Sequence, residues 1–157
     1  MRLTIPTLAL LACAATAASA QAPSMSQGAS DPAITWGPAP AIFPAGAQMA
    51  VLQGDPGSTS LFTVRLKLPA GYKLAPHTHP TEEGVTVISG TLQAGMGATF
   101  DTKGMMALQP GGFVRIPANH AHYIVAQGPT IVQVHAMGPF ALTYVNPADN
   151  PQTSASR

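Results

Sequence analysis

Residues 71–90 read Gly71-Tyr-Lys-Leu-Ala-Pro-His77-Thr-His79-Pro-Thr-Glu-Glu83-Gly-Val-Thr-Val-Ile-Ser-Gly90. In an extended strand, side chains two residues apart lie on the same face, so His77 and His79 can reach one point together. Glu83 keeps the same parity after a short turn. Two neutral imidazoles and a carboxylate that converge in a dry interior are typical of a divalent transition-metal site.

A second segment, residues 110–123, holds another pair of histidines in Pro-Gly-Gly-Phe-Val-Arg-Ile-Pro-Ala-Asn-His-Ala-His-Tyr. Its glycine turn leads into a short apolar strand, which we predict at residues 113–116. Pro117 then ends the pairing of that strand, because proline has no backbone N–H to donate. The segment predicts that a new strand begins after Pro117 and carries a histidine.

Together the two segments resemble the two motifs of the cupin family. The first motif, G-x5-H-x-H-x3-E-x6-G, is matched at every specified position of residues 71–90. The second, G-x5-P-x-G-x2-H-x3-N, is matched at Gly111, Pro117 and His122. The resemblance covers about residues 35–146, and it implies a double-sheet jelly-roll β-barrel, the double-stranded β-helix of cupins.

The second motif departs from the family pattern at two positions. Asn119 stands where the family has glycine, and asparagine tolerates the left-handed backbone that a glycine would adopt there. Ala126 stands where the family has an asparagine that is not a metal ligand. Neither departure removes a residue of the implied metal site.

The resemblance makes His77, His79, Glu83 and His122 the metal ligands. Glu82 is the rival of Glu83, but strand parity turns it the other way, and we interpret it as a solvated or outer carboxylate.

His120 is the rival of His122, because the two form their own H-x-H pair. The family spacing from Pro117 favours His122. His120 is then a turn residue, interpreted either as a substrate contact at the pocket mouth or as a surface histidine.

The strand predicted at residues 130–137 places Gln133 and His135 on one face and Val132, Val134 and Ala136 on the other. One hypothesis aims the polar pair into the pocket, with His135 either supporting a metal ligand or acting as an acid–base residue, and Gln133 as a substrate hydrogen-bond partner. The alternative is that His135 lies at the surface or at a dimer seam.

The rest of the chain also indicates an all-β, single-domain fold. Residues 61–68 alternate between apolar and mixed positions, as in a half-buried strand. Further short strands, punctuated by glycine and proline, are predicted at residues 122–126 and 140–145 among others. No helical period of ten or more residues is present, and such an inventory is typical of a β-sandwich or barrel.

The N-terminus has the pattern of a signal peptide, with Arg2, an apolar run and the A-x-A site Ala18-Ser19-Ala20. We therefore predict a signal peptide at 1–20, a flexible leader at 21–33, the cupin domain at 34–146 and a flexible tail at 147–157. The expected location is periplasmic or secreted. A lipoprotein site at Cys13 is the competing interpretation, and under ordinary cleavage this only cysteine is lost with the signal.

Charge excludes one class of partner. Of seven Lys and Arg residues, Arg2 leaves with the signal, so six basic residues face six acidic ones. So balanced a chain offers no basic patch for nucleic acid or an anionic membrane. Low charge also means little self-repulsion, which leaves a homodimer open.

A site of three histidines and one carboxylate suits Fe, Mn, Zn, Ni or Cu, and the ion stays undetermined. Among metal cupins this arrangement supports dioxygenase-like and isomerase-like chemistry as well as simple binding. Two hypotheses follow: a metal-dependent, oxygenase-like enzyme acting on a small organic molecule, and a non-catalytic protein that binds a metal or a small ligand.

Overall fold

The computed structural model describes residues 33–154. Apart from three short helical segments, its regular elements are strands. In chain order the elements are β1 (Gly37–Pro38), β2 (Gln48–Gln53), β3 (Leu61–Leu68), β4 (Lys73–Thr78), β5 (Glu83–Ser89), β6 (Leu92–Met96), η2 (Thr102–Gly104), β7 (Met106–Leu108), β8 (Phe113–Ile116), β9 (His122–Ala126), β10 (Thr130–Met137), β11 (Thr143–Tyr144), η3 (Pro147–Asp149) and α1 (Pro151–Ser154).

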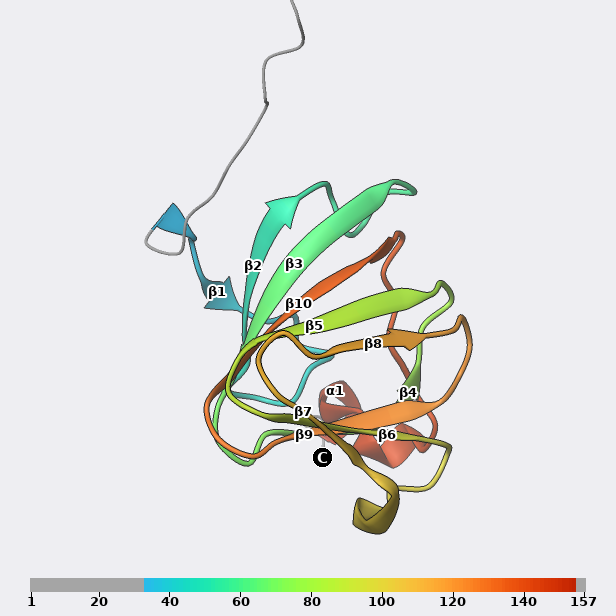
Figure 1. Cartoon of the computed structure of the whole chain (residues 1–157). Helices are drawn as coiled ribbons and strands as arrows, with labels where there is room; N and C mark the ends of the chain where they lie inside the picture. Colours follow the sequence, from blue (N-terminus) through green and yellow to red (C-terminus); the bar gives the residue numbers. More distant parts are fainter. Residues whose placement is uncertain (1–32, 155–157) are drawn as a thin grey trace, which may run out of the picture.

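The strands form two antiparallel sheets that face each other (Figure 1). The larger has the order β1-β2-β3-β10-β5-β8, and the smaller has the order β11-β4-β9-β6-β7. This arrangement fits the jelly roll expected from the sequence, but hydrogen bonding does not close the described strands into a barrel. The sheets end in strands of two to four residues, β1, β8, β11 and β7, and Pro117 directly after β8 cannot extend the ladder.

The predicted strands at residues 61–68, 113–116, 122–126 and 130–137 are confirmed with the same bounds. In β3 every second side chain, from Phe62 to Leu68, is buried, and the residues between them are half-buried. β3 and β10 are neighbouring strands of the larger sheet, and their inward-facing side chains lie opposite each other, for example Val64 and Val134. This apolar layer forms much of the core between the sheets.

The predicted strand at residues 140–145 is shorter in the structure, where only Thr143 and Tyr144 pair with β4. Residues 138–142 instead run as an irregular segment beside the end of β4, and this difference bears on the site described below. Within residues 147–154 of the expected tail, the structure has η3 and α1.

None of the helices among residues 33–154 is long and apolar enough to cross a membrane. The signal peptide and nearly all of the leader predicted from the sequence lie outside the described residues.

Candidate metal centre

Three histidines from both motifs meet between the two sheets. His77 on β4 and His122 on β9 are direct cross-strand partners, and His79 follows the last residue of β4. All three are buried, and one ring nitrogen of each lies within 4.8 Å of the others. The structure therefore brings together the three imidazoles that the sequence singled out.

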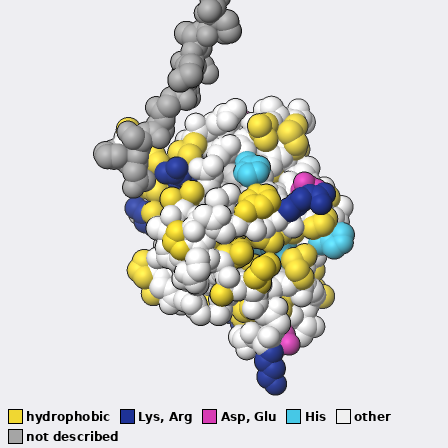
Figure 2. Space-filling model, viewed as in Figure 1, with side chains coloured by type: hydrophobic (Ala, Val, Ile, Leu, Met, Phe, Trp, Pro, Cys, Tyr) yellow, Lys and Arg dark blue, Asp and Glu magenta, His cyan; other side chains and the backbone are white. Residues whose placement is uncertain are grey.

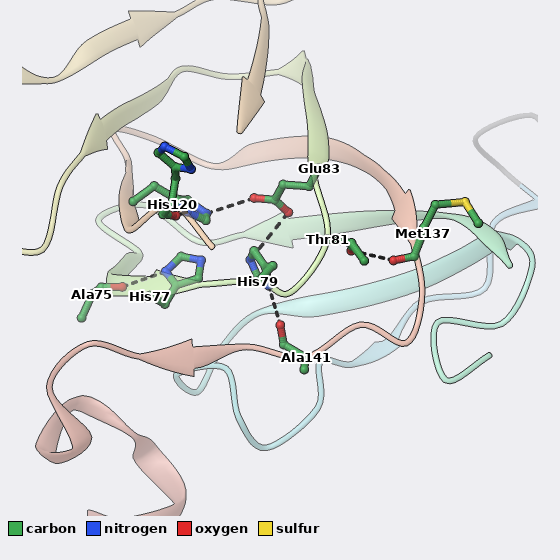
Figure 3. A network of polar contacts seen from close by, with 9 residues as sticks. Ala75, His77, His79, Thr81, Glu83, His120, Met137 and Ala141 are labelled. Carbon is green, nitrogen blue, oxygen red and sulfur yellow. Dashed lines mark hydrogen bonds and ion pairs between the residues drawn. The ribbon is translucent and has the colours of Figure 1, made fainter. Parts of the chain in front are cut away.

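Hydrogen bonds orient each of these rings, and Figure 3 shows those of His77 and His79. The Nδ1 atoms lie within hydrogen-bond distance of backbone carbonyls, which can only accept, so each Nδ1 carries the proton. In that tautomer Nε2 keeps its lone pair and is the ligand atom, as in most protein metal sites. The three pairs are His77 with Ala75 at 2.8 Å, His79 with Ala141 at 2.7 Å, and His122 with His120 at 3.1 Å.

Glu83, the first residue of β5, brings a carboxylate from the opposite sheet to the same place. One of its oxygens lies 3.0 Å from Nε2 of His122, and the other lies 3.6 Å from Nε2 of His79. Because both Nε2 atoms carry lone pairs, each contact sets two acceptors against each other. A cation between them removes that repulsion, so this donor set fits a divalent metal ion.

Burial favours the neutral forms of His77 and His79. It lowers the pKa of His77 to about 2, and the nearby imidazoles of His122 and His79 add to the effect. Burial also lowers the pKa of His79, against the opposing influence of Glu83. An imidazole that stays neutral can bind a metal without first losing a proton.

These pKa shifts predict how the stability of the metal-free protein depends on pH. The unfolded chain takes up a proton on His77 below about pH 6.5, whereas the folded chain resists protonation down to about pH 2. Stability therefore falls as the pH is lowered through this window, by about 1.4 kcal/mol per pH unit from His77. Urea unfolding between pH 7.5 and 4.5 measures the slope. His77→Gln should flatten it, and an equal slope in the variant would contradict the assignment.

The four side chains are among those that line an interior cavity of about 40 Å³. A single water needs roughly 10–15 Å³ by this measure, so the cavity has room for a few water-sized groups. Every other lining residue is apolar: Phe43, Leu66, Leu74, Val85, Leu92, Ala94, Val114, Ile116, Ile124, Val132, Val134 and Phe140.

The irregular segment 138–142 covers His79. The ring of Phe140 stacks on the His79 imidazole, with centroids 4.6 Å apart, and Ala141 supplies the carbonyl for its Nδ1. Backbone hydrogen bonds from Gly138 and Phe140 hold the segment to the turn between β2 and β3. The sequence does not reveal the hydrogen bond from His79 to the Ala141 carbonyl, because every residue carries a backbone carbonyl.

The turn before β9 joins the second motif to the first. Asn119 adopts the expected left-handed conformation, with φ of 62°, and its N–H donates to the carbonyl of His79 at 2.8 Å. His120 is exposed, and its Nδ1 contacts only the carbonyl of Ala118. The structure therefore separates the two histidines of this H-x-H pair, with His122 inside and His120 outside.

The structure corrects the hypothesis that Gln133 and His135 face the pocket. On β10 the cavity is lined by Val132 and Val134, so the residues between them point to the outer face of the larger sheet. His135 lies over Gly84 there, since a Cβ at Gly84 would come 2.5 Å from its Nε2.

The amide oxygen of Gln133 accepts a hydrogen bond from Arg65 Nε at 3.2 Å on the same outer face. Glu82 is also exposed, as expected from its parity, and forms an ion pair with Arg115 that lowers the pKa of the carboxyl.

A family comparison agrees with this geometry. The model of the cupin domain matches residues 64–138, the part of the chain that supplies all four donor side chains. The chain contains a cupin domain. No curated protein sequence matches the chain.

Solved structures share the fold of this cupin at low sequence identity. The polyketide cyclase RemF from Streptomyces resistomycificus has a TM-score of 0.66 at 16% identity, covering 85% of this chain and 94% of RemF. A candidate acetylacetone dioxygenase from Methylibium petroleiphilum has a TM-score of 0.63 at 20% identity, with coverages of 83% and 88%. KdgF from Halomonas sp. has a TM-score of 0.54 at 20% identity, with coverages of 68% and 90%. At such identities the likeness concerns the fold alone.

Proposed function

We propose that this cupin holds one divalent metal ion through His77, His79, His122 and Glu83 and acts as an oxygenase-like enzyme on a small organic molecule. The observation that carries the proposal is the orientation of the three rings. Each Nδ1 is engaged by a carbonyl, so three Nε2 lone pairs and a carboxylate meet in one buried place.

The adjoining cavity supports a role beyond metal storage, because it leaves room for a second molecule beside the ion. A bound divalent ion of this ligand type supplies Lewis acidity and, if redox-active, a route for reaction with dioxygen. The protein's own groups fix the donors, exclude bulk water and surround the bound molecule with hydrocarbon. Among the structural neighbours, one is described as a candidate dioxygenase and another as a cyclase.

A non-catalytic binding protein is the second candidate, and the position of His135 favours it. With His135 and Gln133 on the outer face, Glu83 is, among residues 33–154, the only residue lining the cavity besides the three imidazoles that can exchange a proton. A protein that only holds a ligand needs no further acid or base.

Oxygen consumption separates the two candidates. The protein is loaded in turn with iron and manganese, its metal content is measured, and diketones, catechols and flavonoids are offered. The enzyme proposal expects oxygen uptake that depends on both the metal and the organic compound. Binding of these compounds without any oxygen uptake would favour the second candidate instead.

The two neighbouring glutamates give a matched test of the ligand set. Glu83→Gln should weaken zinc binding by at least about 10- to 100-fold, the loss typical of removing a partner of a ligand, because it removes a ligand and its negative charge. Glu82→Gln removes the same charge one residue away, at the surface, and should leave zinc affinity unchanged. Isothermal titration against a competing chelator measures both constants. Equal effects of the two variants would contradict the role of Glu83.

We also propose that the chain is exported after cleavage behind Ala20. The supporting pattern is Arg2, the apolar run and the A-x-A site. The intact mass of the exported protein should correspond to a chain that begins at Gln21. A lipid-modified mass beginning at Cys13 would instead support the lipoprotein interpretation.

A further inference from the structure

The side chains that line the cavity next to the donor cluster are chemically uniform. Apart from the three imidazoles and Glu83, its lining contains only hydrocarbon side chains, with no hydroxyl, amide or amine among the described residues. Val132 and Val134 of β10 line it from the larger sheet, and Leu92 and Ile124 line it from the smaller sheet. A polar group on a bound molecule would find no protein partner in this part of the cavity.

The positive charges of the described chain all lie elsewhere. Figure 2 shows basic side chains as separate groups on the surface. Arg115 is exposed and paired with Glu82, and the ammonium of Lys73 lies over the ring of Phe100, which is not a cavity residue. None of the five Lys and Arg residues between 33 and 154 lines the cavity: Arg65, Lys67, Lys73, Lys103 and Arg115.

This distribution limits the charge that a bound molecule can bring. If the proposed function is right, a divalent cation and the Glu83 carboxylate leave one net positive charge among three neutral imidazoles. One negative charge on the incoming molecule neutralises the site, and a second would be buried without a counter-charge. Burying an unpaired ion in a hydrocarbon environment is strongly unfavourable.

We infer that the substrate class of this site is a small molecule with one singly anionic oxygen-donor group and an otherwise uncharged hydrocarbon body. This inference rests on the proposed function. Enolisable diketones and similar monoanionic chelators satisfy it. Sugar phosphates and dicarboxylates do not, because their additional charges have no partner in the cavity.

Phe140 sets the size of the accepted body. It stacks on His79 and also packs edge-on against Phe62, with ring centroids 5.4 Å apart, so its ring has little freedom to move aside. Because the cavity has room for only a few water-sized groups, we expect a short branched alkyl group to fit it better than a phenyl group.

Two hydroxamic acids with the same metal-binding head and the same number of heavy atoms test the inference. Isovalerohydroxamic acid ends in two methyl groups, and the monohydroxamic acid of malonic acid ends in a carboxylate. Titration into the zinc-loaded full chain should show the isovaleryl compound binding at least about tenfold more tightly. Equal affinities, or tighter binding of the carboxylate compound, would overturn the inference.

The zinc content of the same sample separates this inference from the proposed function. Absence of zinc refutes the proposed function, and the cavity is then tested without metal. Xenon should shift the methyl NMR signals of Val132 and Val134 in the metal-free protein, because dry apolar cavities bind xenon. No shift at these methyl groups would overturn the apolar-cavity argument independently of any metal.

The variant Phe140→Ala tests whether Phe140 limits the size of the bound molecule. We measure the ratio of the affinity for benzohydroxamic acid to that for isovalerohydroxamic acid. In the zinc-loaded variant this ratio should be about tenfold higher than in the zinc-loaded wild type. An unchanged ratio, with zinc content preserved, would contradict the role given to Phe140.

Discussion

Replacing His122 with alanine is expected to abolish stoichiometric binding of zinc. The variant loses an Nε2 donor that lies 3.0 Å from the Glu83 carboxylate. Metal content after dialysis against a weak chelator, together with titration of the metal-free protein, measures the effect.

His120→Ala is the matched control. His120 is the other member of the H-x-H pair and is exposed, and its carbonyl, which accepts from His122, is kept in the variant. Zinc binding should therefore be unchanged. Retention of one zinc per chain in His122→Ala, or its loss in His120→Ala, would show that the second motif had been assigned to the wrong histidine.

The largest expected effect on stability comes from Phe62→Ala. Phe62 is fully buried on β3 and packs edge-on against Phe140. Removing the ring leaves a cavity in the core, and such substitutions cost about 3–5 kcal/mol. Urea denaturation of the metal-free protein measures the free energy of unfolding without a contribution from bound metal.

Leu61→Ala tests the same strand on its other face. Leu61 is 48% exposed, so its replacement should change the free energy of unfolding by no more than about 0.5 kcal/mol. Similar costs for the two neighbouring variants would mean that the inward face of β3 is not the one described.

The sequence predicts best those strands whose apolar side chains alternate regularly and whose ends are marked by glycine or proline. Residues 61–68 alternate strictly and are followed by Pro69, and residues 113–116 lie between a glycine turn and Pro117. Parity also separates Glu83 from Glu82, because adjacent strand residues point in opposite directions and only one of them can reach the interior.

Parity alone does not say which face is inside. The pattern places Gln133 and His135 on one face of β10, as the structure does, but it leaves open whether that face lines the pocket or the surface. The structure buries Val132 and Val134 instead, because burying hydrocarbon is favourable and burying an amide without a partner is costly.

The tertiary contacts of the site could not be predicted from the residues. The carbonyl of Ala141 and the ring of Phe140 reach His79 across more than sixty residues of sequence, through a segment expected to be a strand. Only the packing of that segment against the end of β4 brings these groups to the site.

A crystal structure of the zinc-loaded protein, with anomalous data collected at the zinc edge, tests the metal site most directly. We predict one strong anomalous peak between the sheets, about 2.0–2.2 Å from Nε2 of His77, His79 and His122 and from a carboxylate oxygen of Glu83. A zinc peak at His120 or His135 on the surface, with no density at the buried cluster, would contradict the account.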